Sequence, residues 1–392
     1  MKKIVVFDSH PVQYRVPIWK ELSKSKNINL HVVYATDCSV KGYNDTGFGT
    51  KVAWDGGMLE DYDNTILNSE NGTPLKGWSS LTGKGVLKQI KDLKPDYILL
   101  TGLNYKYDMI VYILARANKI PLWLRCENQD YVTERSKFKS IIRSFIYKNI
   151  YKGFSRFLYI GELNKSHYVK HGVPDKKLSP VKYTTVNRFS DYTNKEKLEI
   201  RQKQREEYPL DEHKYVIGFS GKLIPKKNPD LLLECVSFLP EEIKRKINFL
   251  FIGSGALENS LKAKAAQLNK EYGIKTIFTG FVNQSQMPNN YLAVDVIVLP
   301  SRKQGETWGL VANEGLQAGV SVIVSDSVGS HKDFEKLERF KVCKTENAED
   351  LAHKIVELLD YKLDFDWAQE ALIEYSIATN VKNIRALIDY SA

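Results

Sequence analysis

The chain of 392 residues has no long apolar run and no paired cysteines. Its longest plain apolar run, Met109–Ala115, is far shorter than the roughly 20 residues that span a bilayer. The apolar stretch at the N-terminus ends at Asp8 and is too short for the core of a signal peptide. The four cysteines are scattered without C-x-x-C spacing, which argues against zinc or a disulfide framework. We therefore expect an intracellular, cytoplasmic protein.

Basic residues outnumber acidic ones, 57 to 47, and give a formal net charge of +10. The sign of this charge indicates an acidic partner, such as a nucleoside diphosphate or an anionic lipid headgroup. The sequence shows no aromatic-basic ribonucleoprotein motif, basic zipper or zinc-finger spacing, so we expect no nucleic acid partner. Hydrophobic and charged contents of 43% and 27% are those of an ordinary globular protein.

Short apolar strands alternate with helical segments along the whole chain, which predicts an α/β fold of parallel, doubly wound sheets. The expected strands are Lys3–Phe7, Asn29–Tyr34, Tyr97–Leu100, Leu122–Leu124, Phe157–Ile160, Val216–Ser220, Phe249–Ile252, Thr276–Phe278, Val296–Leu299 and Val322–Val324. The charged, helical-looking segment Lys195–Tyr208 interrupts this rhythm. We therefore place a domain boundary there and expect an N-terminal Rossmann-like domain over 1–194 and a second one over 195–366. Ligands of such sheets bind beyond the carboxyl ends of the strands, so two facing sheets predict one central cleft.

Two glutamates eight positions apart, Glu306 and Glu314, follow the strand Val296–Leu299. A helical pattern from about Trp308 to Ala318, ending at Gly319, predicts that backbone amides and the helix dipole favour an anion at the turn before it. Eight helical positions span about 12 Å, on the order of the distance from the hexose to the ribose of a nucleotide sugar. Both carboxylates suit neutral diols. The alternative is that the dipole alone stabilises them and that Glu314 is simply solvated.

The segment Glu306–Ile323 resembles the E-x7-E signature of retaining glycosyltransferases of family 4. Gly218–Asn228 is similar to the G-R-L-x-x-x-K-N/G segment of that family, and Phe251–Gly255 and Phe278–Val282 are similar to its I-G-x-G and F-x-G-x-V strand ends. The resemblance is specific over Tyr215–Asp333 and weaker before residue 150. It implies a GT-B fold, in which the last helix, here expected within 367–392, crosses back onto the first domain.

The resemblance also assigns roles around the cleft. Glu306 would hold the hydroxyls of the donor sugar and Glu314 the ribose, while Lys222 and Lys227 would neutralise the diphosphate. Lys222 stands where the family more often has arginine, and lysine keeps the charge without the bidentate fork. The expected donor-binding residues are Gly221, Lys222, Lys227, Gly253, Val282, Glu306, Thr307, Trp308, Gly309, Leu310, Val311 and Glu314.

The segment Ser9–Pro17 replaces the glycine-rich turn of many family members and resembles the S-H-P-x-Q-Y opening of a bacterial subset. We expect it to line the cleft, although Ser9 and His10 alternatively only close a turn. In Arg125–Asn128, Glu127 either takes a proton from the acceptor or pairs with Arg125 as plain structure. The expected acceptor-side residues are His10, Gln13, Tyr14, Arg15 and Arg125, and the expected catalytic residues are Glu306, Lys227, Lys222, His10 and Glu127.

Two further segments bear on the acceptor. The glycine-rich excursion from Cys38 to Thr82 has little periodicity and is a candidate acceptor surface or a disordered loop. Residues 137–152 form a basic amphipathic pattern. Such a helix either packs on its own sheet, which we favour, or lies on an anionic membrane that carries lipid-linked acceptors.

The sequence thus predicts a retaining hexosyltransferase that uses a nucleoside-diphosphate sugar and a carbohydrate or lipid-linked acceptor in cell-surface glycan synthesis. We expect no metal or other cofactor, because the two Asp-x-Asp patterns, at Asp61 and Asp364, lack the context of a metal site and the lysines already supply positive charge. A location at the inner face of the plasma membrane would suit a lipid-linked acceptor. Rival functions are a nucleotide-sugar epimerase, a sugar phosphorylase and a non-enzymatic nucleotide-binding protein.

Overall fold

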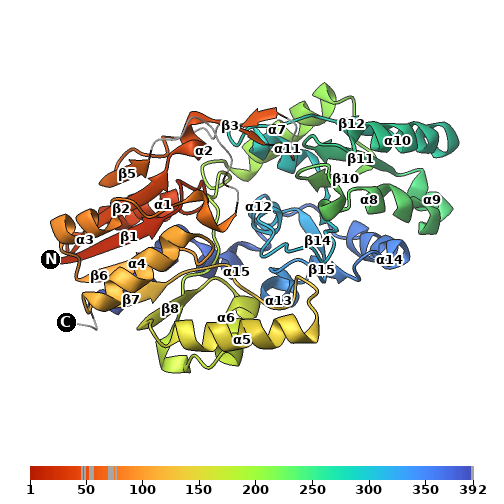
Figure 1. Cartoon of the computed structure of the whole chain (residues 1–392). Helices are drawn as coiled ribbons and strands as arrows, with labels where there is room; N and C mark the ends of the chain where they lie inside the picture. The colour runs from red at the N-terminus through yellow and green to blue at the C-terminus, as the bar shows by residue number, and fades with distance from the viewer. Residues whose placement is uncertain (46, 48–49, 53–56, 69–74, 76, 390–392) are drawn as a thin grey trace.

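A computed structural model describes residues 1–45, 47, 50–52, 57–68, 75 and 77–389. Within this part of the chain, the strands form a seven-stranded sheet, a six-stranded sheet and a two-stranded ribbon. Figure 1 shows the two large sheets on opposite sides of the molecule, the first in red to yellow-green and the second in green to blue. The predicted α/β architecture with two parallel sheets is confirmed.

The N-terminal sheet is parallel throughout, with the order β5-β2-β1-β6-β7-β8-β9. Its strands are β1 (Lys2–Asp8), β2 (Ile28–Thr36), β5 (Asn64–Asn68), β6 (Tyr97–Leu100), β7 (Leu122–Leu124), β8 (Arg156–Tyr159) and β9 (Leu178–Pro180). The helices of this half are α1 (Val16–Ser23), α2 (Cys38–Lys41), α3 (Val86–Leu93), α4 (Lys106–Ala117), α5 (Lys137–Tyr151), α6 (Glu162–Lys170) and the short turns η1 (Trp78–Ser80) and η2 (Asp175–Lys177). The ribbon pairs β3 (Tyr43–Asp45) with β4 (Thr50–Val52).

Successive side chains of β1 enter different cores. Val6 packs with Trp19 of α1 on one face of the sheet, and Phe7 packs with Tyr107 of α4 on the other. Because both faces are covered, these strands are apolar without alternation, which is why their sequence pattern was easy to recognise.

The C-terminal sheet is also parallel, with the order β12-β11-β10-β13-β14-β15. Its strands are β10 (Tyr215–Ser220), β11 (Ile247–Ile252), β12 (Thr276–Phe278), β13 (Val296–Leu299), β14 (Ser321–Ser325) and β15 (Phe340–Cys343). Its helices are α7 (Asn194–Glu207), α8 (Asp230–Glu234), α9 (Glu241–Lys244), α10 (Glu258–Tyr272), α11 (Met287–Ala293), α12 (Val311–Gln317), α13 (His331–Phe334), α14 (Ala348–Leu359) and the short turns η3 (Pro225–Lys227) and η4 (Cys235–Phe238).

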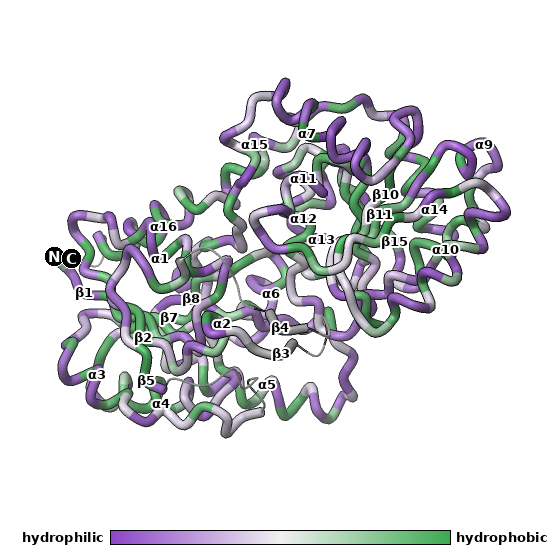
Figure 2. Tube along the Cα trace, turned by 90° about the horizontal axis from the view of Figure 1, so that it is seen from above, coloured by the Kyte–Doolittle hydropathy of each residue, from purple (hydrophilic) through white to green (hydrophobic). Residues whose placement is uncertain are grey.

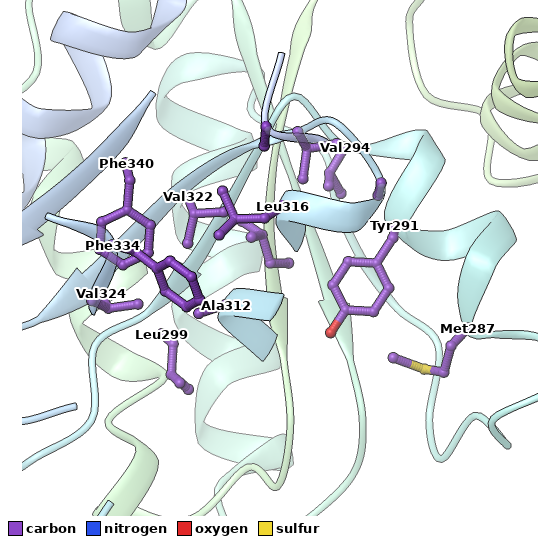
Figure 3. Packing of buried hydrophobic residues seen from close by; sticks show 14 of the residues in the cluster. Met287, Tyr291, Val294, Leu299, Ala312, Leu316, Val322, Val324, Phe334 and Phe340 are labelled. Carbon is purple, nitrogen blue, oxygen red and sulfur yellow. The ribbon is translucent and has the colours of Figure 1, made fainter. Parts of the chain in front are cut away.

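One core of this half fixes the elements that surround the predicted site. Figure 3 shows Leu316 of α12 packed near Val322 of β14, with Tyr291 of α11 on the other side of the view. All three side chains are buried. The positions of α11 and α12 relative to the sheet are therefore set by close packing, which tolerates little displacement.

Two predicted helices have different bounds in the structure. The helix expected from Trp308 begins only at Val311, because Gly309 has a left-handed φ of +88° that interrupts helical backbone. The helix expected within 367–392 is, over the described residues 367–389, not one helix but α15 (Gln369–Leu372), the turn η5 (Ile373–Tyr375) and α16 (Ile377–Asp389). The break falls at Ser376, which has extended backbone and whose hydroxyl accepts a hydrogen bond from the amide of Thr379 at 3.1 Å.

The chain end returns to the first half of the molecule. Val381, Ile384 and Ile388 of α16 belong to the same core as Trp19 of α1. α7, by contrast, contacts the second half, since Arg201 donates hydrogen bonds of 2.8 Å to the carbonyls of Leu292 and Val294. The exact domain boundary near residue 195 stays a prediction.

α5 contradicts the packing that the sequence favoured. Tyr151 is its one buried residue, whereas Phe138 and Phe145 are 72% and 71% exposed. The helix contacts the core only near its C-terminal end, through Tyr147, Ile150 and Tyr151. Figure 2 shows α5 at the outer edge of the molecule, where green and purple stretches follow one another along the tube. The helix α5 is therefore amphipathic, as the sequence pattern predicted, but its apolar face does not lie on the sheet.

The glycine-rich excursion 38–82 contains α2, the ribbon, β5 and η1. The acceptor role suggested for it falls in part on residues 46, 48–49, 53–56, 69–74 and 76, which lie outside the described residues.

Candidate active site

The carboxyl ends of β10, β11 and β13 open onto a cavity of about 310 Å³ between the two sheets. Residues from both halves of the chain line it: Gln13, Glu127, Tyr183, Ser220, Gly221, Lys227, Ile252, Gly253, Phe281, Val282, Gln284, Met287, Glu306, Thr307, Trp308, Gly309, Leu310, Val311 and Glu314. Every residue expected to bind the donor is in this set except Lys222. The side chain of Lys222 belongs to the turn after Gly221 but does not line the cavity.

Glycines bring the strand ends close together at this cavity. Gly253 follows β11 with a φ of +137°, and a Cβ there would lie 2.0 Å from the carbonyl oxygen of Gly221. No larger residue fits this approach without moving backbone. The sequence similarity around Gly221 and Gly253 thus marks a place where two strand-end loops touch at the wall of the cavity.

Glu306 forms an ion pair with Lys227, with the ammonium nitrogen 2.6 Å from Oε2. The side chain of Glu306 is 12% exposed and that of Lys227 is 19% exposed. Burial acts to raise the pKa of Glu306, but the Lys227 ammonium outweighs it, so the pKa of Glu306 is lowered. The carboxylate of Glu306 is therefore ionised at neutral pH. The cavity is thus lined by a charged hydrogen-bond acceptor, Glu306, and a charged donor, Lys227.

The loop that carries Glu306 is tied to the turn that carries Lys227. The amide of Arg302 donates to the carbonyl of Lys226 at 2.8 Å, and the Lys226 ammonium donates to the carbonyl of Gly305 at 3.1 Å. These contacts hold two segments far apart in the sequence in one fixed relation. These hydrogen bonds between the loop of Glu306 and the turn of Lys227 thus position the two residues of the ion pair.

Glu314 lies on α12 and accepts a hydrogen bond of 2.6 Å from the hydroxyl of Tyr291 on α11. Burial raises the pKa of Glu314, and the hydrogen bond from Tyr291 offsets this only in part. The hydroxyl of Tyr291, visible in red in Figure 3, also lies 3.2 Å from Oγ of Ser220 at the end of β10. Glu314 therefore has one oxygen engaged, at the border between this cavity and a second one that Arg188, Gln284 and Tyr291 line.

Glu127 receives hydrogen bonds from both halves of the chain. Its Oε1 accepts from the hydroxyls of Tyr14 and Tyr183 at 3.3 and 2.8 Å, and its Oε2 accepts from the hydroxyl of Thr307 at 3.2 Å. The expected alternative, a pair with Arg125, is wrong. Arg125 is buried, and its guanidinium lies 5.7 Å from the ring centre of Tyr183 instead.

The N-terminal segment lines a third cavity that contains Ser9, His10, Tyr14, Arg15, Asn104 and Glu127. Nδ1 of His10 lies 2.9 Å from the hydroxyl of Ser9, and burial lowers the pKa of His10 to about 4, so the imidazole is neutral at pH 7. Arg15 forms a buried ion pair of 3.1 Å with Asp8. That pair stabilises the turn that contains Arg15, while Gln13 lines both the cavity between the sheets and the second cavity beside Glu314.

Trp308 has a packing role as well as a place in the cavity wall. Its ring stacks on Tyr183 at 5.4 Å with an interplanar angle of 13°, and its indole donates a hydrogen bond of 2.6 Å to Asn313. Tyr183 comes from the segment that connects the two sheets, so this stack joins them. No local sequence pattern marks either Tyr183 or Tyr291, since each reaches the site only through tertiary packing.

Among the described residues, none of the helices combines the length and the apolar composition that crossing a bilayer requires.

Comparison with known proteins places this geometry in a class. Residues 200–377, which contain Glu306 and Glu314, match the family model described as "Glycosyl transferases group 1". Over the whole chain, the fold matches HepE of Anabaena, a structure with UDP and glucose, at a TM-score of 0.68, 15% identity and complete coverage of both chains. Together these matches support a GT-B glycosyltransferase family.

Curated relatives agree with the class. The chain is 33% identical to an uncharacterized glycosyltransferase, MJ1607, of Methanocaldococcus jannaschii over 33% of this chain and 31% of that protein. It spans about a third of that relative and of the glycogen synthase of Flavobacterium johnsoniae. A longer match, at 26% identity over 91% of this chain and 89% of the relative, is to the N,N'-diacetylbacillosaminyl-diphospho-undecaprenol alpha-1,3-N-acetylgalactosaminyltransferase of Campylobacter jejuni subsp. jejuni serotype O:2.

Proposed function

We propose that this chain is a retaining glycosyltransferase of family 4 that transfers a hexose from a nucleoside-diphosphate sugar to a glycan or lipid-linked acceptor. The observation that carries the proposal is the cavity between the sheets, in which the Glu306–Lys227 ion pair and Glu314 lie on the wall of a group 1 domain. The two carboxylates suit the hydroxyls of a sugar and of a ribose, and the lysine suits the diphosphate between them.

The charges of the site favour departure of a nucleoside diphosphate. Cleavage at the anomeric carbon leaves about one extra negative charge on the phosphate, and a cation already in place stabilises that charge without reorganisation. In this chain Lys227 is held at the cavity by Glu306 before any donor binds. When a diphosphate enters, Lys227 is positioned to contact it while Glu306 turns to the sugar hydroxyls. Lys222, which does not line the cavity, has a supporting role at most.

We place the acceptor in the cavity of His10, Asn104 and Glu127, which shares Glu127 and Thr307 with the donor-side cavity. The neutral imidazole of His10 and the amides of that wall can hydrogen-bond a hydroxyl. The acceptor oxygen attacks from the face that the phosphate leaves, and the departing phosphate oxygen takes the acceptor proton. Glu127, whose two oxygens already accept three hydrogen bonds, positions the acceptor and the domains.

A lipid-linked acceptor fits the exposed face of α5. Phe138, Ile141, Ile142, Phe145 and Ile146 are exposed on a helix that also carries Lys137, Lys139 and Lys148. Exposed apolar side chains beside lysines bind the interface of an anionic membrane. The Campylobacter relative is named for a diphospho-undecaprenol-linked sugar. We therefore infer peripheral attachment to the inner face of the plasma membrane, where such acceptors take part in cell-surface glycan synthesis.

A product assay tests the proposed function. The purified protein is incubated with UDP-, GDP-, ADP- and CDP-hexoses, with and without a lipid-linked glycan fraction, and nucleotide release and sugar products are measured. Transfer with retained anomeric configuration, dependent on the acceptor, supports the proposal. Conversion of the donor without acceptor would establish an epimerase, and phosphate-dependent sugar release without nucleotide would establish a phosphorylase. Binding without any turnover would leave a nucleotide-binding protein.

A further inference from the structure

Away from the cavity, two histidines and an aspartate meet between the loop after β7 and the end of α6. His167 and His171 are four positions apart, one on α6 and one at its end, and Asp130 lies in the loop. Nδ1 of His167 is 3.1 Å and Nε2 of His171 is 3.4 Å from Oδ2 of Asp130. These three atoms all lie within 4.8 Å of one another, so three potential ligands converge on one point.

The three converging atoms face one another, and the opposite nitrogen of each imidazole ring has a partner of its own. Oδ2 of Asp130, Nδ1 of His167 and Nε2 of His171 are buried, and Oδ2 contacts both imidazole nitrogens. Nε2 of His167 is 2.8 Å from the hydroxyl of Tyr151, and Nδ1 of His171 is 3.2 Å from that of Ser144. The side chains of the two histidines are 0% and 3% exposed. Fixing the outer ring nitrogen in this way is how proteins orient metal-ligating histidines.

We propose that Asp130, His167 and His171 bind a divalent metal ion, with Zn²⁺ as the best match. Two imidazoles and one carboxylate are a zinc donor set, and bond lengths of about 2.0–2.2 Å imply a tetrahedral ligand separation of roughly 3.3 Å. The separations of 3.1 and 3.4 Å lie on either side of that value. A cavity of about 640 Å³ that Asp130 and His171 line adjoins the cluster and has room for water as a fourth ligand.

The charges around the cluster permit this ion. Arg143 pairs with Oδ1 of Asp130 and leaves Oδ2 to the metal. Lys170 is 3.4 Å from Oδ2, but its side chain is 64% exposed and can turn into solvent. The competing account is a triad in which both neutral imidazoles donate to Asp130 without metal.

The metal would connect the loop after β7 to α6, and this loop also touches the donor side of the cleft. The amide of Gly305 donates to the carbonyl of Val132 at 2.8 Å, and Gln129 donates to the carbonyl of Thr307. A metal on Asp130 would therefore stabilise one wall of the cleft as a structural ion. Neither this site nor its test depends on the proposed transferase activity.

The test measures metal binding by the full-length protein. Metal-stripped protein is titrated with Zn²⁺ by calorimetry, bound metal is counted by mass spectrometry, and Co²⁺ is substituted to record the visible spectrum. We expect one equivalent of zinc, a tetrahedral Co²⁺ spectrum, and affinity at least about tenfold weaker in His167→Gln and Asp130→Asn. The control His213→Gln changes an 86% exposed histidine and should bind as the wild type does.

Folded wild-type protein, checked by circular dichroism, that binds no zinc at micromolar free concentrations would overturn the proposal in favour of the metal-free triad. Zinc bound equally well by His167→Gln, or lost equally in His213→Gln, would also overturn it, because the ion would then be elsewhere. If a variant fails to fold, the zinc stoichiometry and the Co²⁺ spectrum of the wild-type protein decide the test.

Discussion

Glu127, which follows β7 of the N-terminal sheet, accepts a hydrogen bond of 3.2 Å from the hydroxyl of Thr307 in the loop that carries Glu306. The contact joins the two halves of the chain at the point where the cavity between the sheets meets the cavity that His10 and Asn104 line. Because the other oxygen of Glu127 accepts from Tyr14 and Tyr183, the carboxylate holds four segments in one arrangement. A side chain so engaged is suited to positioning rather than to repeated proton transfer.

We predict that Glu127→Gln lowers kcat/KM by less than about a hundredfold, because a positioning residue loses less than a general base, for which 10²–10⁴ is typical. Thr307→Val should give an effect of similar size, since it removes the same bond. Nucleotide affinity should change little in either variant. Loss of nearly all turnover in Glu127→Gln, together with loss of the acidic limb of the pH–rate profile, would instead make Glu127 the base.

Glu306→Gln should reduce turnover by about 10²–10³-fold, the usual cost of removing one preorganised charged group from a transfer site. The nucleotide should still bind, because Glu306 is assigned to the sugar. Glu357→Gln, which changes a glutamate paired with Lys354 on α14, is the matched control and should leave turnover unchanged. Single-turnover rates and nucleotide affinity are measured for both variants. Equal turnover in the two would remove Glu306 from the site.

Stability should respond in opposite directions at the two glutamates. The folded-state pKa of Glu306 lies below its unfolded value, so its contribution to folding is present above the unfolded pKa and is lost as pH falls. The folded-state pKa of Glu314 lies above its unfolded value. The contribution of Glu314 to folding is therefore present below the unfolded pKa and is lost as pH rises through the folded pKa. At neutral pH, Glu306→Gln should therefore lower Tm and Glu314→Gln should raise it, each by about 2 °C or more.

Thermal unfolding of the two glutamine variants across the acidic to neutral range checks these signs. The difference in Tm between each variant and the wild type should shrink as pH falls, through the lowered folded-state pKa of Glu306 for Glu306→Gln and through the raised folded-state pKa of Glu314 for Glu314→Gln, since each carboxyl is then protonated. Shifts of the same sign at neutral pH would show that the electrostatic surroundings of one glutamate are not as described.

The exposed face of α5 should bind anionic membranes. Phe138→Ser combined with Phe145→Ser removes the two most exposed phenylalanines of that face. Each substitution loses roughly 1.5–3 kcal/mol of apolar burial in the membrane interface, so pelleting with vesicles of anionic lipid should fall by at least about tenfold. Leu198→Ser combined with Ile373→Ser is the control, because these exposed apolar residues lie outside α5. Equal pelleting of both double variants, or binding independent of anionic lipid, would contradict membrane attachment through α5.

Much of the fold and of the wall of the cavity between the sheets was predictable because the signals are local. The buried strands are continuous apolar runs, and Glu306, Gly309 and Glu314 follow one of them in a recognisable pattern. The strands β5, β9 and β15 were not predicted, since Asn64–Asn68, Leu178–Pro180 and Phe340–Cys343 are short or largely polar and gain their pairing from neighbours in the sheet.

Residues that depend on tertiary structure could not be found from local patterns. Tyr183 and Tyr291 reach Glu127 and Glu314 from a connecting segment and from α11, with no spacing that marks them. His167 and His171 have a visible four-residue spacing, but Asp130 joins them only through the packing of a loop. The helical periodicity of α5 predicted an amphipathic helix, but it did not predict whether the apolar face contacts the sheet or the solvent.

Calorimetric titration of the protein with UDP, GDP, ADP and CDP, repeated with Glu314→Ala, addresses the donor site most directly. We expect saturable binding of one nucleotide and at least about tenfold weaker affinity in the variant, because a lost charged hydrogen bond costs roughly 1.5–3 kcal/mol. Glu357→Ala should bind that nucleotide as the wild type does. Absence of binding by all four nucleotides, or equal affinity in Glu314→Ala, would contradict the assignment of this cavity to a nucleotide-sugar donor.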